Sequence, residues 1–449
     1  MLDFQKKLSN GFYLVLGLPS TAMGFGLSIQ IAVLSWILST KYNLDIHHIG
    51  FVWAAGPIAG ILGQPLIGLI SDKVWFLGGR RRPFIIIGGI LTALAVLALP
   101  NIGLINDFFG IGSLMAVAIT VALTLDLAIN ISFNPTRAII ADVTPDGSPR
   151  TKGYTWMQST SNLFGSLAYL TGALLGNYTL IYAGVFVILG FSIIPMFFIE
   201  EPRHLEQQSE KTINNADPTQ TQWGQLFRIY GAHFFSWLGV QTMFVYIIAF
   251  LQQKMFTAEV VQKYAFIQDL KQKGVMLSED LLKIDRLVSD QTGQMIGIAF
   301  FLLNAVSFMM PAFLLEPLSR KIGRVKVHVA SLTIMALGYL TIAMFVHSAM
   351  MLYVMISVVC IGWAAIVSLP FAIMSEKVDK SRMGYFMGIF NLSVVLPQLV
   401  SSLFLGTVIQ TTENKSIVFF ISAVSLAISA FLWIFVTDKS HLKTTNYKE

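Results

Sequence analysis

The sequence has 449 residues, of which 55% are hydrophobic and only 12% are charged. Soluble globular chains carry roughly 25% charged residues, and the long apolar stretches between the charges exclude a soluble enzyme. The formal net charge of +6 does not indicate a nucleic-acid partner, because the basic residues stand at the ends of apolar stretches, where membrane topology accounts for them. The single cysteine, Cys360, has no second cysteine with which to form an internal disulfide.

A helix that crosses a bilayer needs roughly 20 mainly apolar residues, and twelve stretches of the chain meet this requirement. They lie at residues 11–38, 49–71, 84–105, 111–141, 154–177, 179–199, 227–251, 293–317, 327–347, 349–373, 384–410 and 416–436. The first stretch is too long for the apolar core of a signal peptide, so we expect it to be the first span. The sequence therefore predicts an all-α membrane protein with twelve transmembrane helices.

Polar segments divide these spans into two six-helix halves. The N-terminal half covers residues 1–199 and the C-terminal half residues 227–437, joined by the polar linker 200–226 and followed by a polar tail, 438–449. A second polar segment, the outer insert 252–291, separates spans seven and eight, and we expect it to hold a small amphipathic helix outside the bilayer. The Lys and Arg residues concentrate in alternate short loops, which places both termini in the cytoplasm. Two six-helix halves with a site between them are typical of the major facilitator fold.

The loops after spans two and eight are weakly repeated. "GLISDKVWFLGGRRRPF" follows span two and "EPLSRKIGRVK" follows span eight, with Ser319 where Asp72 stands in the first copy. We expect Asp72, Arg80, Arg81 and Arg82 to form a cytoplasmic clamp that controls the conformational change and does not touch the substrate. Later in the chain, Glu376 and Lys380 are four residues apart, which favours an ion pair between them at the same surface.

Span four carries two charges that a bilayer interior disfavours, Asp126 and Arg137. An ionisable side chain there costs about 2.5–3.5 kcal/mol on insertion scales, so such residues are candidates for function. Eleven residues of helix give about 20° of rotation and roughly 16 Å of rise, so the two share a face at different depths, together with Asn130. Asp126 is a candidate proton carrier. The alternative is that Asp126 is a buried acid satisfied by its neighbours, with Arg137 extending towards the cytoplasm.

Amide and aromatic side chains form further polar stripes. Gln158, Asn162 and Tyr169 share one face of span five, and Asn391 and Gln398 share one face of span eleven. The other candidates are Gln30 in span one, Gln64 in span two, and Trp237 and Gln241 in span seven. Amides bond hydroxyl groups and flat rings stack on apolar sugar faces, whereas hydrogen bonding between helices is the alternative role for such amides. No metal-ligand spacing and no phosphate-binding loop is present, so we expect no cofactor and no ATP-driven pump.

Several motifs together resemble one family. They are "FGLSIQ" in span one, "WAAGPIAGILGQPLIGLISDK" followed by "GRRRPF", "LDLAIN" followed by "PTRAIIAD" in span four, and "SLPFAIMS" and "GIFNLSVVLPQLVSS" in spans ten and eleven. The chain resembles the sucrose–proton symporters within the glycoside–pentoside–hexuronide:cation symporter group. The resemblance covers residues 11–165 and 360–402. It implies that Asp126 is the proton-coupling acid, that Arg137 is the essential arginine of span four, and that Asn130 lies near the sugar.

The chain also departs from the family pattern. Ile129 replaces one of two paired asparagines, and His47 is offset by one from the outer-loop histidine of the family. The expected function is proton-coupled import of a disaccharide-type glucoside, of the sucrose or maltose class, by a monomer in the cell membrane. Its expected partners are the sugar, H⁺ and the lipid bilayer. An efflux antiporter for amphipathic compounds, a sugar:Na⁺ symporter and a non-transporting sugar sensor are the alternatives.

Overall fold

A computed structural model describes residues 3–42, 55–203, 221–273 and 275–438 of the chain. His47 and most of the linker lie outside the described residues, and the side chain of Gln64 is not described either. Within the described ranges the regular structure is helical, with one isolated bridge between Phe76 and Gly79 in the loop before the third span.

The N-terminal half runs from α1 to η2. Its elements are α1 (Asp3–Lys6), α2 (Asn10–Thr40), α4 (Ala55–Lys73), α5 (Arg82–Ala98), η1 (Leu99–Asn101), α6 (Ile102–Phe109), α7 (Leu114–Val143), α8 (Ser148–Leu175), α9 (Asn177–Ile193) and η2 (Ile194–Phe197).

The C-terminal half runs from α10 to α19. Its elements are α10 (Trp223–Lys254), α11 (Ala258–Gln272), α12 (Glu279–Ser307), η3 (Pro311–Leu315), α13 (Glu316–Ile322), α14 (Arg324–Phe345), α15 (Ala349–Ile366), α16 (Leu369–Ser375), η4 (Lys380–Arg382), α17 (Met383–Val400), η5 (Ser401–Leu405), α18 (Gly406–Thr411) and α19 (Ile417–Trp433).

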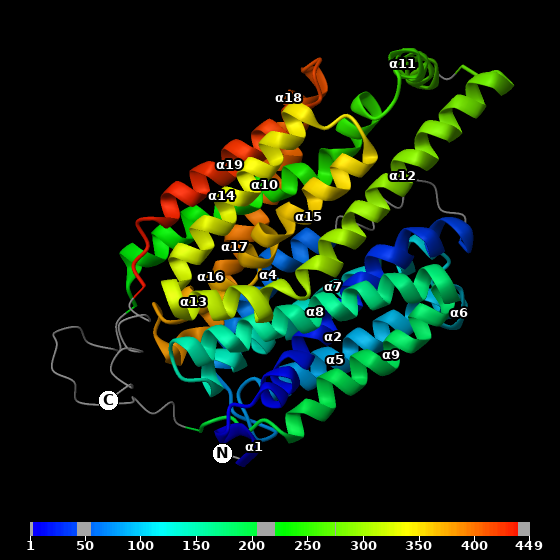
Figure 1. Ribbon diagram of the computed structural model, residues 1–449. Coiled ribbons are helices and arrows are strands. Elements are labelled where there is room, and N and C mark those ends of the chain that lie inside the picture. The colour runs from blue at the N-terminus through cyan, green and yellow to red at the C-terminus, as the bar shows by residue number, and fades with distance from the viewer. Residues whose placement is uncertain (1–2, 43–54, 204–220, 274, 439–449) are drawn as a thin grey trace.

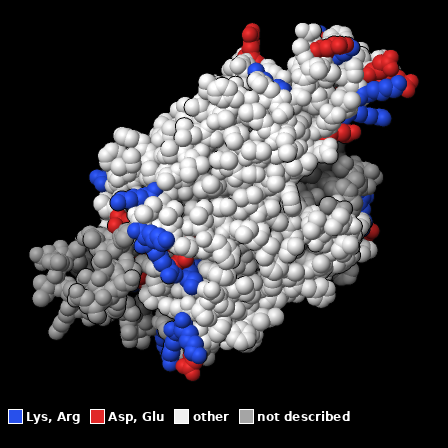
Figure 2. Space-filling view, in the orientation of Figure 1, with Lys and Arg blue, Asp and Glu red and all other residues white. Residues whose placement is uncertain are grey.

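The predicted spans are confirmed as helices. Nine helical segments of the described chain are long and apolar enough to cross a membrane, and α4, α8 and α19 occupy the three remaining predicted spans. The two halves lie side by side, and α1 and the C-terminal end of α19 lie at one end of the molecule, which we call the termini end (Figure 1). A broad band of uncharged surface separates charged groups at the termini end from those at the opposite end (Figure 2), as expected for a protein that faces lipid around its middle.

Proline interrupts several spans. Two π-helical turns lie close to prolines. One of them, η3, begins at Pro311, and the other, η5, follows Pro397 of α17. Proline removes a backbone donor from the helix ladder, and π-turns of this kind are frequent at functional sites. The span formed by α15 and α16 breaks at Val367 and Ser368, and Pro370 stands in the first turn of α16, where a helix does not need the N–H group that proline lacks.

The outer insert is largely helical. It contains α11, and α12 begins at Glu279, well before the predicted start of span eight near residue 293. Figure 1 shows α11 and the first turns of α12 at the end opposite the termini. Ile267 and Val288 are buried there, and Gln268 donates to Asp285 at 3.5 Å, so α11 packs on the extension of α12.

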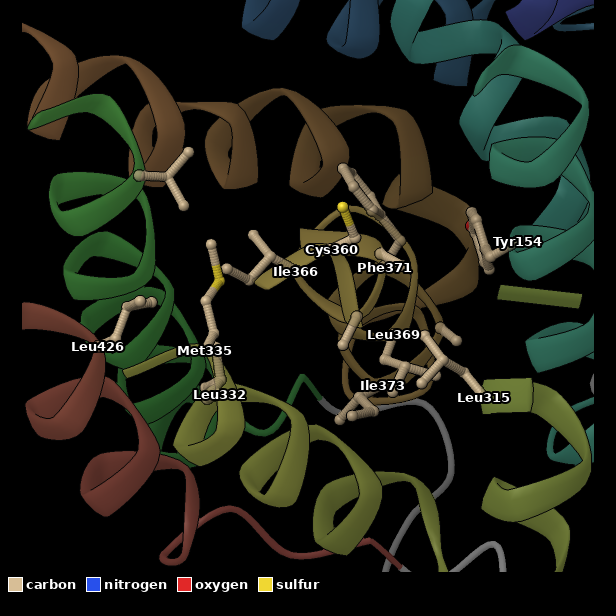
Figure 3. Packing of buried hydrophobic residues seen from close by; sticks show 14 of the residues in the cluster. Tyr154, Leu315, Leu332, Met335, Cys360, Ile366, Leu369, Phe371, Ile373 and Leu426 are labelled. Carbon is tan, nitrogen blue, oxygen red and sulfur yellow. The ribbon is translucent and has the colours of Figure 1, made fainter. Parts of the chain in front are cut away.

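The apolar core joins the two halves near the termini end. One buried cluster contains residues of both halves, among them Tyr154 of α8 and Phe371 of α16. Figure 3 shows these two rings facing one another beside Leu315, Leu369 and Ile373. A second buried cluster belongs to the N-terminal half alone.

Candidate functional site

Asp126 lies in the middle of α7 with only 8% of its surface exposed. Gln30 of α2 donates from Nε2 to Oδ1 of Asp126 at 3.1 Å. Asn130, one turn along α7, donates from Nδ2 to the backbone oxygen of Asp126 at 2.7 Å. The Oε1 atom of Gln30 is buried and has no hydrogen-bond partner among the described residues. The structure thus brings together an acid without a basic partner in the described chain and two amides.

Arg137 lies further along α7, towards the termini end. Its guanidinium is 4.6 Å from the ring of Phe133 on the same helix and 4.6 Å from the ring of Phe371 on α16. It makes no ion pair with any carboxylate of the described residues, and its Nε atom is buried without a hydrogen-bond partner there. Asp126 and Arg137 are therefore separate features, one held by amides and the other by aromatic rings.

The polar stripe of α8 divides into two parts. Gln158 donates to Asn162 at 2.9 Å, and Asn162 donates across the interface to the backbone oxygen of Ser307 at 3.2 Å. For Asn162, a hydrogen bond between helices is thus directly observed. Tyr169 lies further along α8, is 37% exposed, and its hydroxyl faces Ser28 of α2. Tyr169 does not join the pair formed by Gln158 and Asn162.

The C-terminal half contributes an aromatic cluster. Trp237 donates from its indole nitrogen to Nε2 of His233 at 2.9 Å, and its ring meets Trp363 edge-on at 5.6 Å. Phe244 meets Trp363 edge-on at 5.4 Å. Such rings offer flat apolar faces to a solute.

Three predicted amides of the C-terminal half make no side-chain hydrogen bond to other described residues. Gln241 lies one turn beyond Trp237 on α10, Asn391 is buried on α17, and Gln398 is half-buried two turns further along α17. A buried amide is normally hydrogen-bonded, so Asn391 keeps unused hydrogen-bonding capacity, and Gln241 and Gln398 are half-buried with the same capacity. His233, Trp363 and Phe371 were not predicted from the sequence. The rule that flagged Asp126 also flags His233, a titratable residue in an apolar span, whereas nothing singles out Trp363 or Phe371 in a chain with many aromatic residues.

The predicted clamp residues meet around Arg81, which is fully buried. Arg81 donates from Nη2 to Asp72 at 2.6 Å and from Nε to Asp142 at 3.0 Å. Arg80 also reaches Asp142, at 3.2 Å, whereas Arg82 lies against the ring of Phe197. Asp72 in turn accepts the backbone N–H groups of Gly384 and Tyr385 at the start of α17, at 2.9 and 2.8 Å. This cluster therefore joins the N-terminal half to the C-terminal half.

Glu201 completes the cluster from what was predicted to be the solvated linker. Its carboxylate accepts the backbone N–H groups of Arg80, Arg81 and Arg82, where α5 begins. A helix N-terminus favours a negative charge. Burial raises the pKa of Glu201, and the backbone N–H groups of Arg81 and Arg82 act in the opposite direction.

The C-terminal half has a related cluster around Arg324, at the start of α14. Arg324 donates to both oxygens of Glu376 at 2.7 Å, and to both oxygens of Asp438 at 2.6 and 2.9 Å. Glu376 also accepts the backbone N–H of Gly147, which precedes α8, at 2.6 Å. The predicted ion pair between Glu376 and Lys380 is wrong, because Lys380 pairs instead with Asp146 at 3.4 Å.

Helices α4 and α17 approach closely beside the Arg81 cluster. A Cβ atom on Gly384 would lie 2.7 Å from the backbone oxygen of Gly68, so the contact requires glycine. Contacts between the halves extend from the termini end towards the middle of the molecule. They are the two arginine clusters, the contact between Gly68 and Gly384, and the hydrogen bond from Asn162 to Ser307. The termini end is therefore closed.

Comparison with protein families identifies the chain. The family model described as Major Facilitator Superfamily matches residues 19–278 and 266–449. The chain belongs to the major facilitator superfamily. It is thus an integral, multi-pass membrane protein of a transporter superfamily, and it is not an enzyme.

Plant sucrose transport proteins are among its relatives. The chain is 26% identical over 438 residues to sucrose transport protein SUT2 of Oryza sativa subsp. indica, which covers 84% of this chain and 83% of the relative. It is 25% identical over 444 residues to sucrose transport protein SUC4 of Arabidopsis thaliana, which covers 86% of this chain and 82% of the relative.

Solved transporter structures share the fold. A bacterial homologue of the iron transporter ferroportin in an outward-facing state has a TM-score of 0.65 at 15% identity, covering 95% of this chain and 98% of its own. The Escherichia coli fucose:proton symporter has a TM-score of 0.64 at 13% identity, covering 96% of this chain and 100% of its own.

Proposed function

We propose that this protein is a proton-coupled symporter that imports a disaccharide-type glucoside by alternating access. The observation that carries the proposal is Asp126, an acid buried in the middle of a span and held by Gln30 rather than by a basic residue. The likeness to plant sucrose transport proteins over more than four fifths of the chain supports the choice of a sugar.

Proton coupling follows from the surroundings of Asp126. A buried charge without a basic partner is costly, and uptake of a proton removes that cost. With Asp126 neutral, the two halves can close over the loaded site without burying an unpaired charge. Gln30, whose Oε1 atom lacks a partner within the described part of the chain, then offers that oxygen to a hydroxyl group of the sugar.

The two halves would divide the recognition of the sugar. The N-terminal half presents amides beside an acid, and the C-terminal half presents Trp237 and Trp363 with the free amides Gln241, Asn391 and Gln398. A sugar has hydroxyl edges and apolar ring faces, so a site between these surfaces would satisfy both.

The conformational cycle would depend on the two arginine clusters. If the positive-inside rule holds and both termini are cytoplasmic, the closed termini end is the cytoplasmic end and the structure is an outward-facing state. Opening towards the cytoplasm must then separate Asp72 from the start of α17 and Glu376 from Gly147.

Uptake into proteoliposomes tests the proposal. With an inward pH gradient, the wild-type protein should accumulate labelled sucrose or maltose above the external concentration. Asp126→Asn should lose accumulation, because the carboxyl group that takes up the proton is gone. Asp107→Asn, an exposed acid of α6, is the matched control and should accumulate sugar normally. Undiminished accumulation by Asp126→Asn would contradict the assignment, and accumulation driven by a Na⁺ gradient alone would replace H⁺ by Na⁺.

A further inference from the structure

Arg137 differs from the other deeply placed arginines of the molecule. Arg81 binds two carboxylates, Arg324 binds two, and Arg150 pairs with Asp146 at 2.5 Å. Within the described residues Arg137 binds none, and its guanidinium lies between two aromatic rings at equal distances of 4.6 Å. A cation at this distance from a ring face is attracted to it, most strongly where water is excluded.

The two rings belong to different halves of the molecule. Phe133 precedes Arg137 by one turn of α7, so its contact is within the N-terminal half and survives any movement of one half against the other. Phe371 belongs to α16 of the C-terminal half, so its contact with Arg137 exists only while the halves are closed at this end. An interaction present in one conformation and absent in the other shifts the equilibrium between them.

The ring of Phe371 contacts aromatic rings of both halves. It stacks on Tyr154 of α8 at 6.1 Å and meets Phe390 of α17 edge-on at 5.0 Å. The hydroxyl of Tyr154 donates to the backbone oxygen of Arg137 at 3.0 Å, so one tyrosine contacts both partners of the cation–ring pair. Figure 3 shows Tyr154 beside Phe371 at the edge of the buried cluster.

We infer that Phe371 is a positioning residue for Arg137. Its ring holds the guanidinium across the interface and thereby favours the conformation in which the termini end is closed. Like the arginine clusters, the contact between Arg137 and Phe371 crosses the interface between the halves, but it involves a ring and no carboxylate. The inference rests on the proposed alternation between two conformations but not on the identity of the solute.

A reporter thiol measures this equilibrium without any solute. Thr151 of α8 is 2% exposed and faces Arg324 of the other half at 3.4 Å, so it becomes accessible only when the termini end opens. In a chain carrying Cys360→Ala and Thr151→Cys, the rate of alkylation by N-ethylmaleimide reports the open fraction. Phe371→Met and Phe133→Met are a matched pair, since methionine keeps much of the volume and lacks a ring face.

Phe371→Met should raise the alkylation rate about 2- to 30-fold, the range expected from the strength of cation–π contacts. Phe133→Met should leave the rate unchanged. In the presence of Arg137→Gln, which by itself should raise the rate, Phe371→Met should add no further increase. Equal rates for the two methionine variants, or an undiminished effect of Phe371→Met beside Arg137→Gln, would overturn the inference.

If Phe371→Met does not fold, the single variant Arg137→Gln still tests the inference. An unchanged alkylation rate in Arg137→Gln would overturn it. Sugar accumulation, measured separately, decides the proposed function. The alkylation assay uses neither sugar nor a proton gradient, so the two proposals can fail independently.

Discussion

The arginine clusters at the termini end are built alike in the two halves, whereas the facing surfaces deeper in the molecule are not. Arg81 and Arg324 both stand where the third span of a half begins, and each binds two acids. Those of Arg81 belong to its own half, and those of Arg324 are Glu376 of its own half and Asp438, the first residue of the tail. Near the middle, the N-terminal half presents Asp126 and Gln30, and the C-terminal half presents aromatic rings such as Trp237. Both halves thus contribute an arginine cluster at the termini end, whereas the chemistry of the proposed solute site is divided between them.

The duplication is not complete. In the N-terminal half, Asp72 makes the contact to the opposite half, and Ser319 stands at that position in the second copy. Ser319 is buried, and its hydroxyl has no hydrogen-bond partner among the described residues. In the C-terminal half, Glu376 makes the crossing contact instead, to Gly147. Each half therefore sends one carboxylate to a backbone N–H group at the start of a helix in the other half.

The largest effect is expected from Arg324→Gln. The substitution removes the guanidinium that binds both Glu376 and Asp438, and breaking a buried ion pair costs about 3–5 kcal/mol. The midpoint of thermal unfolding in detergent should fall markedly. Arg320→Gln, which removes only a half-exposed pair with Glu316, is the matched control and should change the midpoint little. Similar midpoints for the two variants would contradict the importance of the cluster.

A smaller effect is expected from substitution of Asp72 and Glu376, the two acids that contact the opposite half. Asp72→Asn and Glu376→Gln each weaken charge-assisted hydrogen bonds, which contribute about 1.5–3 kcal/mol in proteins. Both variants should raise the alkylation rate of the thiol reporter, and by similar factors if the two contacts are equivalent. An effect confined to one variant would show that only one half controls the closure.

On the C-terminal side of the proposed solute site, His233→Phe is predicted to weaken sugar binding. Phenylalanine keeps the stacking on Phe390, seen at 4.6 Å, but removes the acceptor for the indole N–H of Trp237. Loss of one hydrogen bond worth about 1 kcal/mol should raise KM several-fold, with kcat little changed. His233→Gln keeps an acceptor and should recover part of the affinity. Equal KM values for both variants would argue against a role for this hydrogen bond.

The smallest effect is a pH dependence of stability from Glu201. Burial holds its folded-state pKa above the ordinary value of 4.5. The folded protein therefore binds this proton more tightly than the unfolded chain, so stability is fully present below pH 4.5 and declines as the pH rises through the raised pKa. Glu201→Gln should show a flatter dependence of the unfolding midpoint on pH over this window. An unchanged slope would exclude Glu201 as its source.

Much of the fold could be predicted because its cause is local. Spans follow from the apolar length that a bilayer requires, and the shared face of Asp126 and Asn130 follows from helix geometry. The start of α12 at Glu279 was not predicted. Its first turns are helical but polar, and hydropathy marks only the apolar part of a helix.

The missing parts of the clusters depend on contacts between distant segments. Arg324 and Asp438 are 114 residues apart, and Gly147 and Glu376 are 229 residues apart. No local spacing indicates such pairs. The predicted pair of Glu376 with Lys380 failed because Arg324 offers Glu376 a buried, two-pronged partner, which is stronger than a lysine one turn away.

The most direct test of the account is the movement of protons with the sugar. Addition of sucrose or maltose to proteoliposomes in a weakly buffered medium should make the medium more alkaline, because each sugar carries a proton inward. Asp107→Asn should show the same change, and Asp126→Asn should show none. Sugar uptake without alkalinisation by the wild-type protein, or equal alkalinisation by Asp126→Asn, would contradict proton coupling through Asp126.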